Sequence, residues 1–148
     1  MRKLVIVILL TFISFASDKL YFMPEDGKAF KSDLIEHLEN AKSSIKVAMY
    51  NFEDKKLARV LQKKARSGLH VIVYYYKKDV DFYKKIDVIQ VKRRKLHTKM
   101  AIIDDEIVVF GSANWTKKSF KKNYEMNYIT DNEKIVSQSV KFFENIKE

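Results

Sequence analysis

The chain has 148 residues, of which 47% are hydrophobic, with only 3 Gly, 1 Pro and no Cys. This length predicts a single domain, and the composition excludes a disordered or low-complexity protein. The lack of cysteine excludes disulfides, a thiolate nucleophile and Cys-based zinc sites. The formal net charge of +10 favours a partner that carries phosphates, either nucleic acid or an anionic membrane surface, over a charge that serves solubility alone.

The first 16 residues have the pattern of a secretory signal peptide. Met1–Lys3 carries two positive charges, and Leu4–Ala16 is an almost wholly apolar run that ends in small residues. Because this run is short for a membrane span, we expect cleavage near Ser17, so that residues 17–148 form the exported domain. The protein would then be secreted or periplasmic. The alternative is an uncleaved anchor that holds the domain at the outer face of the inner membrane.

The rest of the sequence alternates strand patterns with helix patterns. In chain order it predicts a strand at Lys19–Met23, a helix at Lys28–Asn40, a strand at Ser44–Asn51, a helix from Asp54 to Gly68, strands at Leu69–Tyr76, Asp87–Val91, Leu96–Ile103, Ile107–Phe110 and Tyr124–Thr130, and a closing helix over Ile135–Ile146. Asp105 and Glu106 form the turn of a predicted hairpin. The expected fold is a single α/β domain in which helices cover both faces of a mixed β-sheet.

One segment carries a recognisable motif. The stretch HTKMAIIDDEIVVFGSAN fits the pattern H-x-K-x4-D-x6-G-S-x-N, with its fixed positions at His97, Lys99, Asp104, Gly111, Ser112 and Asn114. This pattern resembles the phospholipase D superfamily, whose members cleave phosphodiesters with an H-K-D motif. The short chain and the single motif copy are similar to the bacterial Nuc-type endonuclease branch. The resemblance implies a phospholipase D-like fold and extends over about residues 21–130.

The spacing of the motif also has a chemical rationale of its own. Residues two apart on a strand face the same side, so His97 and Lys99 project together. A neutral imidazole can attack phosphorus while the ammonium neutralises a non-bridging oxygen. After the turn at Gly111, Ser112 and Asn114 can donate hydrogen bonds to the same phosphate. Met100 and Ile102, on the other face of the strand, would pack against the core and keep the site rigid.

Two acidic residues complete the candidate catalytic set. The resemblance implies that Glu125 hydrogen-bonds the nucleophilic histidine and fixes its tautomer. Asp104 belongs to the motif, but alternation along the strand places it opposite His97 and Lys99. We therefore expect Asp104 to act structurally, through hydrogen bonds to turn amides, rather than to transfer protons.

Two basic runs flank the motif and indicate a groove for a polyanion. The first is Lys92, Arg93, Arg94 and Lys95, and the second contains Lys117, Lys118, Lys121 and Lys122. Trp115, Phe120 and Tyr124 interleave with the second run, as expected of a channel that binds a single strand. The 3 histidines are scattered and Lys99 stands where a ligand would be needed, so we predict neither a metal nor a cofactor.

The function that these features favour is an exported, metal-independent phosphodiesterase that acts as a non-specific endonuclease on DNA or RNA through a phosphohistidine. A second group must protonate the leaving oxygen, and the chain has one such motif histidine. The resemblance implies that single-motif proteins dimerise, so we expect a homodimer with one shared site. The alternatives are a phospholipase acting on an anionic lipid such as cardiolipin and a catalytically idle nucleic-acid-binding protein.

Overall fold

The computed structural model describes residues 18–82 and 85–147, so the predicted signal peptide lies outside the described residues. The elements, in chain order, are β1 Lys19–Met23, α1 Gly27–Asn40, β2 Ser44–Phe52, α2 Lys55–Arg66, β3 His70–Lys78, β4 Asp87–Gln90, β5 Lys99–Ile103, β6 Ile107–Gly111, α3 Lys117–Lys121, β7 Glu125–Thr130 and α4 Glu133–Glu144. Of the described residues, no helix is long and apolar enough to cross a membrane.

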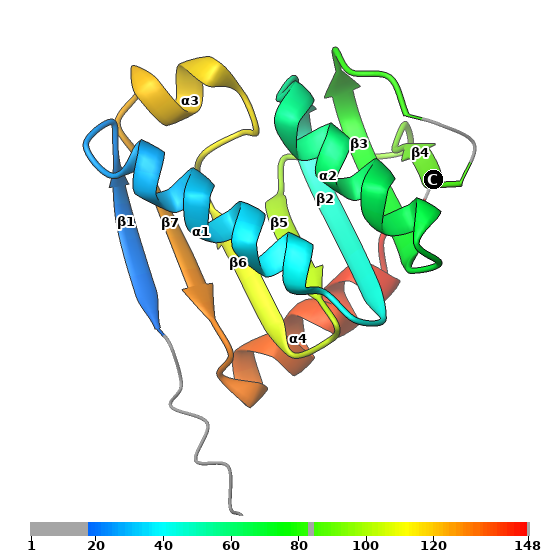
Figure 1. Ribbon diagram of the computed structural model, residues 1–148. Coiled ribbons are helices and arrows are strands. Elements are labelled where there is room, and N and C mark those ends of the chain that lie inside the picture. Colours follow the sequence, from blue (N-terminus) through cyan, green and yellow to red (C-terminus); the bar gives the residue numbers. More distant parts are fainter. Residues whose placement is uncertain (1–17, 83–84, 148) are drawn as a thin grey trace, which may run out of the picture.

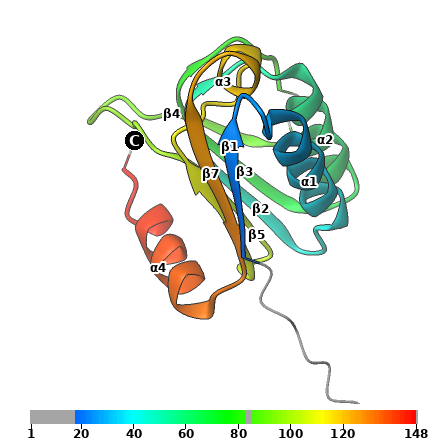
Figure 2. The ribbon, with the colours of Figure 1, turned by 90° about the vertical axis from the view of Figure 1, so that its left-hand side faces the viewer.

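The strands form one mixed, seven-stranded sheet in the order β1-β7-β6-β5-β2-β3-β4. β2, β3 and β4 pair in parallel, and the other neighbours pair antiparallel. Helices α1 and α2 cover one face, with α3 beside the start of α1, and α4 crosses the opposite face (Figures 1 and 2). The predicted α/β fold with helices on both faces is confirmed.

The sheet is buried on both sides around its central strand. All five residues of β5 are buried, with Ala101 and Ile103 packed in the core beneath α1 and α2. Met100 and Ile102 belong to a second cluster against α4, as the sequence predicted. A strand held from both faces has little freedom to shift, so the residues at its start are fixed in place.

Strand directions gather the motif at one edge of the sheet. Because β5 is antiparallel to both of its neighbours, its first residue, Lys99, lies beside the ends of β2 and β6 and one strand away from the start of β7. We call this side of the sheet the His97 edge. The strand predicted to begin at Leu96 begins instead at Lys99, and Thr98 accepts a backbone hydrogen bond from Tyr50 just outside it.

The prediction that Trp115 lines a channel for the substrate was wrong, because its side chain is buried. Trp115 and Phe120 are each only 3% exposed and belong to the main core. The Trp115 ring packs edge-on against Phe52, with centroids 5.0 Å apart, and Phe120 packs against Phe30 at 5.7 Å. Trp115 is held inward by a backbone bridge to Phe52 and by hydrogen bonds from the Glu53 and Asp54 amides to its carbonyl oxygen. The short helix α3, which the sequence analysis did not predict, carries Phe120. Of the three interleaved aromatic residues only Tyr124 is exposed.

Asp104 lies at the far end of β5, opposite the His97 edge, and binds backbone amides as predicted. Its carboxylate accepts hydrogen bonds from the backbone N–H groups of Lys42, Ser43 and Ser44, at 2.8 to 3.1 Å, and from the Ser43 hydroxyl. Burial raises the pKa of Asp104, but these hydrogen bonds outweigh it and hold the pKa below its usual value. Its left-handed backbone, with φ of 57°, also suits a short polar side chain.

We expect Asp104→Ala to destabilise the protein by about 2–4 kcal/mol, because it leaves several amides without their charged acceptor. Asp104→Asn, which keeps the size and tolerates the backbone angle, should cost less. The contribution of Asp104 is present above its unfolded pKa of about 3.9 and is lost as the pH falls through its lower folded value. Urea unfolding of both variants at neutral and acidic pH measures this. Unchanged stability of Asp104→Ala would contradict the structural role.

Candidate active site

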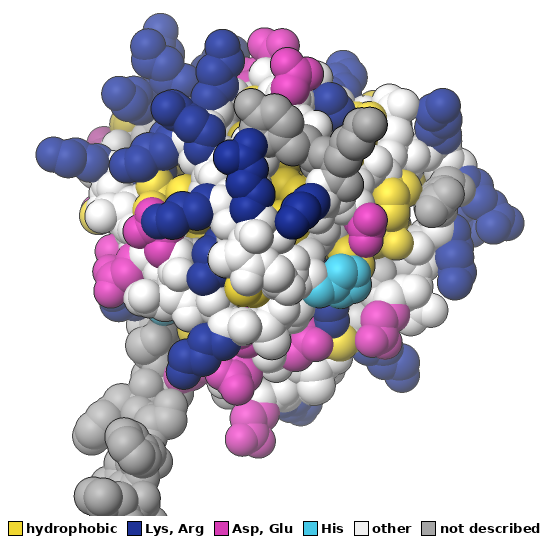
Figure 3. All heavy atoms as spheres, turned by 45° about the vertical axis from the view of Figure 1, so that its right-hand side comes forward, with side chains coloured by type: hydrophobic (Ala, Val, Ile, Leu, Met, Phe, Trp, Pro, Cys, Tyr) yellow, Lys and Arg dark blue, Asp and Glu magenta, His cyan; other side chains and the backbone are white. Residues whose placement is uncertain are grey.

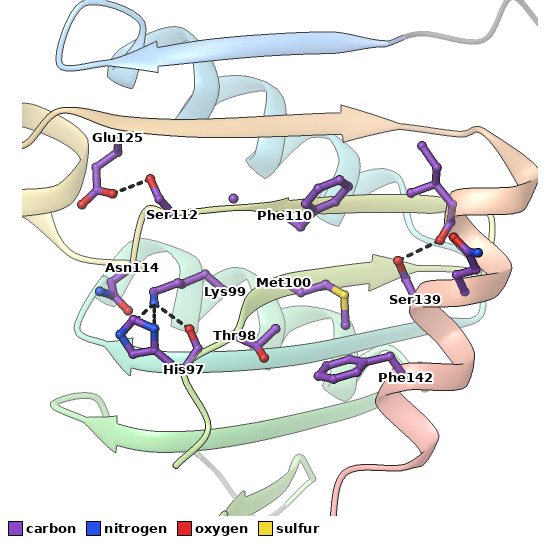
Figure 4. Close-up of a pocket in the computed structure, with 13 residues that line it drawn as sticks. His97, Thr98, Lys99, Met100, Phe110, Ser112, Asn114, Glu125, Ser139 and Phe142 are labelled. Carbon is purple, nitrogen blue, oxygen red and sulfur yellow. Dashed lines mark hydrogen bonds between the residues drawn. The ribbon is translucent and has the colours of Figure 1, made fainter.

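All of the motif residues except Asp104 line an open pocket of about 730 Å³ at the His97 edge. One end is polar and is lined by the start of β5, the end of β6 and the start of β7. The other end is more apolar: Met100, Phe110 and the α4 residues Ile135 and Phe142 line it, together with Gln138 and Ser139. Figure 4 shows His97, Lys99, Ser112, Asn114 and Glu125 at one end, and Met100, Phe110, Ser139 and Phe142 at the other.

His97 and Lys99 are in direct contact, as the sequence predicted. The Lys99 Nζ lies 3.2 Å from His97 Nδ1 and 3.4 Å from Nε2, and it donates a hydrogen bond to the His97 carbonyl oxygen at 2.6 Å. His97 is exposed, whereas Lys99 is only 8% exposed. The ammonium group is therefore held at the floor of the pocket, with the imidazole above it and open to a substrate.

Charge and burial set the protonation of this pair. Burial lowers the pKa of Lys99, while the carboxylate of Glu125 opposes this shift and Lys95 adds to it. The Lys99 ammonium, and after it burial and Lys95, lower the pKa of His97 below its ordinary value of 6.5. His97 is therefore neutral near pH 7, the state in which an imidazole nitrogen can act as a nucleophile.

Ser112 and Asn114 differ in what they can offer a phosphate. The Ser112 hydroxyl donates to Glu125 Oε2 at 2.6 Å and accepts from the Met126 amide, so its proton is already used. The expected hydrogen bond from Ser112 to the phosphate therefore gives way to a role in holding Glu125. Asn114 Oδ1 accepts from the backbone of Asn51 at 3.1 Å, which leaves its Nδ2 group as the donor.

Glu125 does not hydrogen-bond His97 in the described chain, contrary to the resemblance-based expectation. Its carboxylate accepts from Ser112 and from Asn123 Nδ2, the latter at 3.1 Å. The reason is topological: β6 lies between β7, which carries Glu125, and β5, which follows His97. Glu125 still acts on the site through its charge, since it raises the pKa of Lys99.

Sequence reasoning missed Tyr50, which contacts the motif from β2. Its ring lies 4.8 Å from the His97 ring at a tilt of 58°, and the Lys99 Nζ lies 5.3 Å from its centroid. Tyr50 follows Ala48 at the alternating spacing of β2, which places it on the face that α4 covers. The sequence predicted the strand that carries Tyr50 but not its pairing with the motif strand, so no signal pointed to this contact.

The structure places the two basic runs differently: the first adjoins the pocket, whereas the second lies by a separate hollow. Arg93, Arg94 and Lys95 line a second hollow with Thr98 and Phe142, adjoining the first pocket, while Lys92 is exposed nearby in the chain. Lys117 and Lys118 are exposed on α3, and Lys117 lines a separate hollow against α1 and α2. Lys and Arg side chains also gather over the upper part of the face shown in Figure 3, the end of the molecule that holds the His97 edge.

Among the described residues, no three His, Asp or Glu side chains converge in the way that metal ligands do. The nearest side-chain partner of His97 is instead a cation, Lys99. The groups available for phosphate chemistry in the pocket are therefore an imidazole, an ammonium group and an amide.

Comparison with known proteins gives matches of sequence and of fold. Residues 34–147 match the family model described as cardiolipin synthase, PLD-like domain. The mitochondrial cardiolipin hydrolase of Homo sapiens is 28% identical over 135 residues, and that of Xenopus laevis 30% over 139 residues. These alignments cover 82% and 85% of this chain but 52% and 64% of the two relatives, so the chain spans about half the length of the human protein.

Two solved structures match nearly the whole fold. NucT from Helicobacter pylori superposes with a TM-score of 0.77 at 25% identity, covering 89% of this chain and 96% of that one. The phospholipase D family member Nuc from Salmonella typhimurium superposes with a TM-score of 0.76 at 21% identity, covering 89% and 94%.

Because Lys95 and Lys99 lower the pKa of His97, the His97 imidazole should titrate below 6.5 in an NMR pH titration. Lys95→Gln removes one of these charges and should move the midpoint to higher pH. Lys42→Gln, which removes an exposed charge at the opposite edge, is the matched control and should leave the midpoint unchanged. A His97 midpoint at or above 6.5 in the wild type would contradict this account.

Proposed function

Because this chain belongs to the phospholipase D-like family, we propose that it is a metal-independent endonuclease that cleaves DNA or RNA through a phosphohistidine. Family membership and the predicted resemblance to the Nuc-type branch are confirmed, and phosphodiester chemistry follows from them. The choice of nucleic acid as substrate is the proposal.

The observation that carries the proposal is the neutral imidazole of His97 above the buried ammonium group of Lys99. An anionic phosphate entering the pocket would meet Lys99 and the Asn114 amide as partners for its non-bridging oxygens. These preorganised donors stabilise the charge that builds up at phosphorus during attack. The exposed basic side chains of Arg93, Arg94 and Lys95, which adjoin the pocket, suit a polymer of phosphates.

In the proposed reaction a His97 nitrogen attacks phosphorus, and the bond from phosphorus to the leaving oxygen breaks. A second, protonated imidazole donates its proton to that oxygen. Water then attacks the phosphohistidine, the same second imidazole takes a proton from the water, and His97 is released. One group thus serves first as acid and then as base. Because Lys99 lowers the pKa of His97 in the free protein, the second imidazole would take up its proton when the anionic phosphate enters and offsets that positive charge.

We infer that the second imidazole is His97 of a partner subunit, because one chain supplies a single motif histidine. The β1, β6 and β7 strands support this with an exposed apolar face that consists of Leu20, Phe22, Phe110, Met126 and Tyr128. Leu20, Phe22 and Met126 are each about half exposed. This face adjoins Ser112 and Glu125 at the pocket, so a second copy packed on it would bring the two sites together.

We further propose that the protein lies outside the cytoplasm. The apolar run at residues 4–16 would direct its export or hold it at a membrane.

A second candidate function is hydrolysis of an anionic phospholipid such as cardiolipin. The apolar end of the pocket, at Phe110, Ile135 and Phe142, favours this alternative, as do the relatives named cardiolipin hydrolase. The match to nearly the full length of NucT favours the nuclease.

The protein without residues 1–16 should cleave single-stranded DNA, duplex DNA or RNA in excess EDTA. The reason is that the Lys99 ammonium group, rather than a metal ion, stabilises the negative charge of the phosphate. His97→Ala should reduce turnover by at least about a thousandfold, as expected for loss of a nucleophile, while polyanion binding is kept. His70→Ala removes an exposed histidine at the other edge and should have no effect. Cardiolipin vesicles tested in parallel separate the two functions.

Loss of wild-type activity in EDTA that magnesium restores would overturn the metal-independent mechanism. Hydrolysis of cardiolipin without cleavage of any nucleic acid would contradict the nuclease function and support the phospholipase function. Full activity of His97→Ala would show that another residue is the nucleophile.

Sedimentation should show a dimer that Phe22→Lys converts to a monomer, because the new charge would be buried in the apolar interface. Phe22→Leu keeps an apolar side chain and should remain dimeric. Cleavage by Phe22→Lys should fall together with its dimer fraction. A wild-type monomer that cleaves at full rate would contradict the shared active site.

A further inference from the structure

Three lysine ammonium groups converge on the ring of Tyr50. The Nζ atoms of Lys99, Lys95 and Lys77 lie 5.3, 5.4 and 5.9 Å from its centroid. The three lysines come from β5, from the segment before it and from the end of β3. The fold thus brings separate positive charges to one aromatic ring beside the nucleophile.

This arrangement leaves positive charge without a negative partner. Within the described chain, neither Lys77 nor Lys95 forms a salt bridge. A tyrosine ring attracts cations by its quadrupole but supplies no net charge. Of the three charges, Lys95 and Lys99 repel one another, since the Lys95 charge lowers the pKa of Lys99. An anion placed between them would relieve that repulsion.

The ring that organises the cluster is itself held in place. Tyr50 stacks on Tyr76 with centroids 5.4 Å apart and ring planes at 13°, and its backbone N–H donates to Thr98, the residue between His97 and Lys99. Lys99 belongs to the reacting centre, whereas Lys77 and Lys95 are both exposed and lie outward from it. The cluster therefore extends from the scissile phosphate to the surface.

We propose that Lys77 and Lys95, ordered by the Tyr50 ring, form a subsite for a second phosphate of the substrate, next to the one that His97 attacks. The enzyme would then prefer substrates with a further phosphate beside the scissile diester to those with a single phosphate. This inference rests on the proposed phosphodiesterase function, but it holds for a nucleic acid and for a lipid with two phosphates alike.

The dinucleotide TpT has one phosphate. It can be compared with pTpT, which has a second phosphate at the 5′ end, and with TpTp, which has a second phosphate at the 3′ end. For the wild type we expect kcat/KM to be about tenfold higher for one of the longer two, which corresponds to one charged hydrogen bond. Lys77→Gln should reduce this ratio towards one. Lys42→Gln, at the opposite edge, should leave the ratio unchanged. Cardiolipin compared with phosphatidylglycerol, in otherwise identical vesicles, is the corresponding lipid pair.

Binding separates the subsite from the reaction. With His97→Ala, which retains the cations, NMR titration should show tighter binding of pTpT or TpTp than of TpT, and Lys77→Gln in this background should abolish the difference. Equal binding of all three would overturn the subsite even if the wild type cleaves nucleic acid. A preserved preference in a protein that cleaves neither nucleic acid nor lipid would support the subsite and overturn the proposed function.

Discussion

The active site depends on an ammonium group held almost out of water against a histidine ring. A buried ammonium is unfavourable unless it is hydrogen-bonded, and the His97 carbonyl oxygen accepts from Lys99 Nζ at 2.6 Å. The same positive charge lowers the pKa of His97. In the proposed reaction, this one contact would supply both a partner for a phosphate oxygen and a neutral nucleophile. The histidine and the lysine would then act as a unit.

The sheet fixes the position of the His97–Lys99 contact and brings further side chains next to it. β5 is the fourth of seven strands and is buried on both faces, so the start of β5 cannot move far. Its antiparallel neighbours end where it begins. Asn114, which follows β6, lines the pocket, and Tyr50 on β2 contacts the His97 ring. At the far end, Asp104 ties the same strand to the amides of residues 42–44. The motif aspartate thus stabilises the strand whose other end carries the reaction.

The elements and the central pair could be predicted because both depend on local periodicity: apolar spacing marks strands and helices, and an H-x-K spacing puts two side chains on one face. Other features depend on strand order, which periodicity does not contain. Glu125 is kept from His97 by the intervening β6, and Tyr50 reaches His97 because β2 lies beside β5. Trp115 is buried because its backbone pairs with the end of β2, a contact between distant parts of the chain that periodicity does not show.

The two edges of the sheet differ in whether their charged side chains have partners within the chain. At the Asp104 edge, carboxylates find partners within the chain: Asp104 binds amides and Asp105 pairs with Lys46 at 2.8 Å. At the His97 edge, Lys77, Lys95 and Lys99 face one another without a salt bridge in the described residues. Folding thus brings together positive charges that repel, at a cost in stability. A bound polyanion would offset that cost, so the charges that weaken the free protein here are those that favour its substrate.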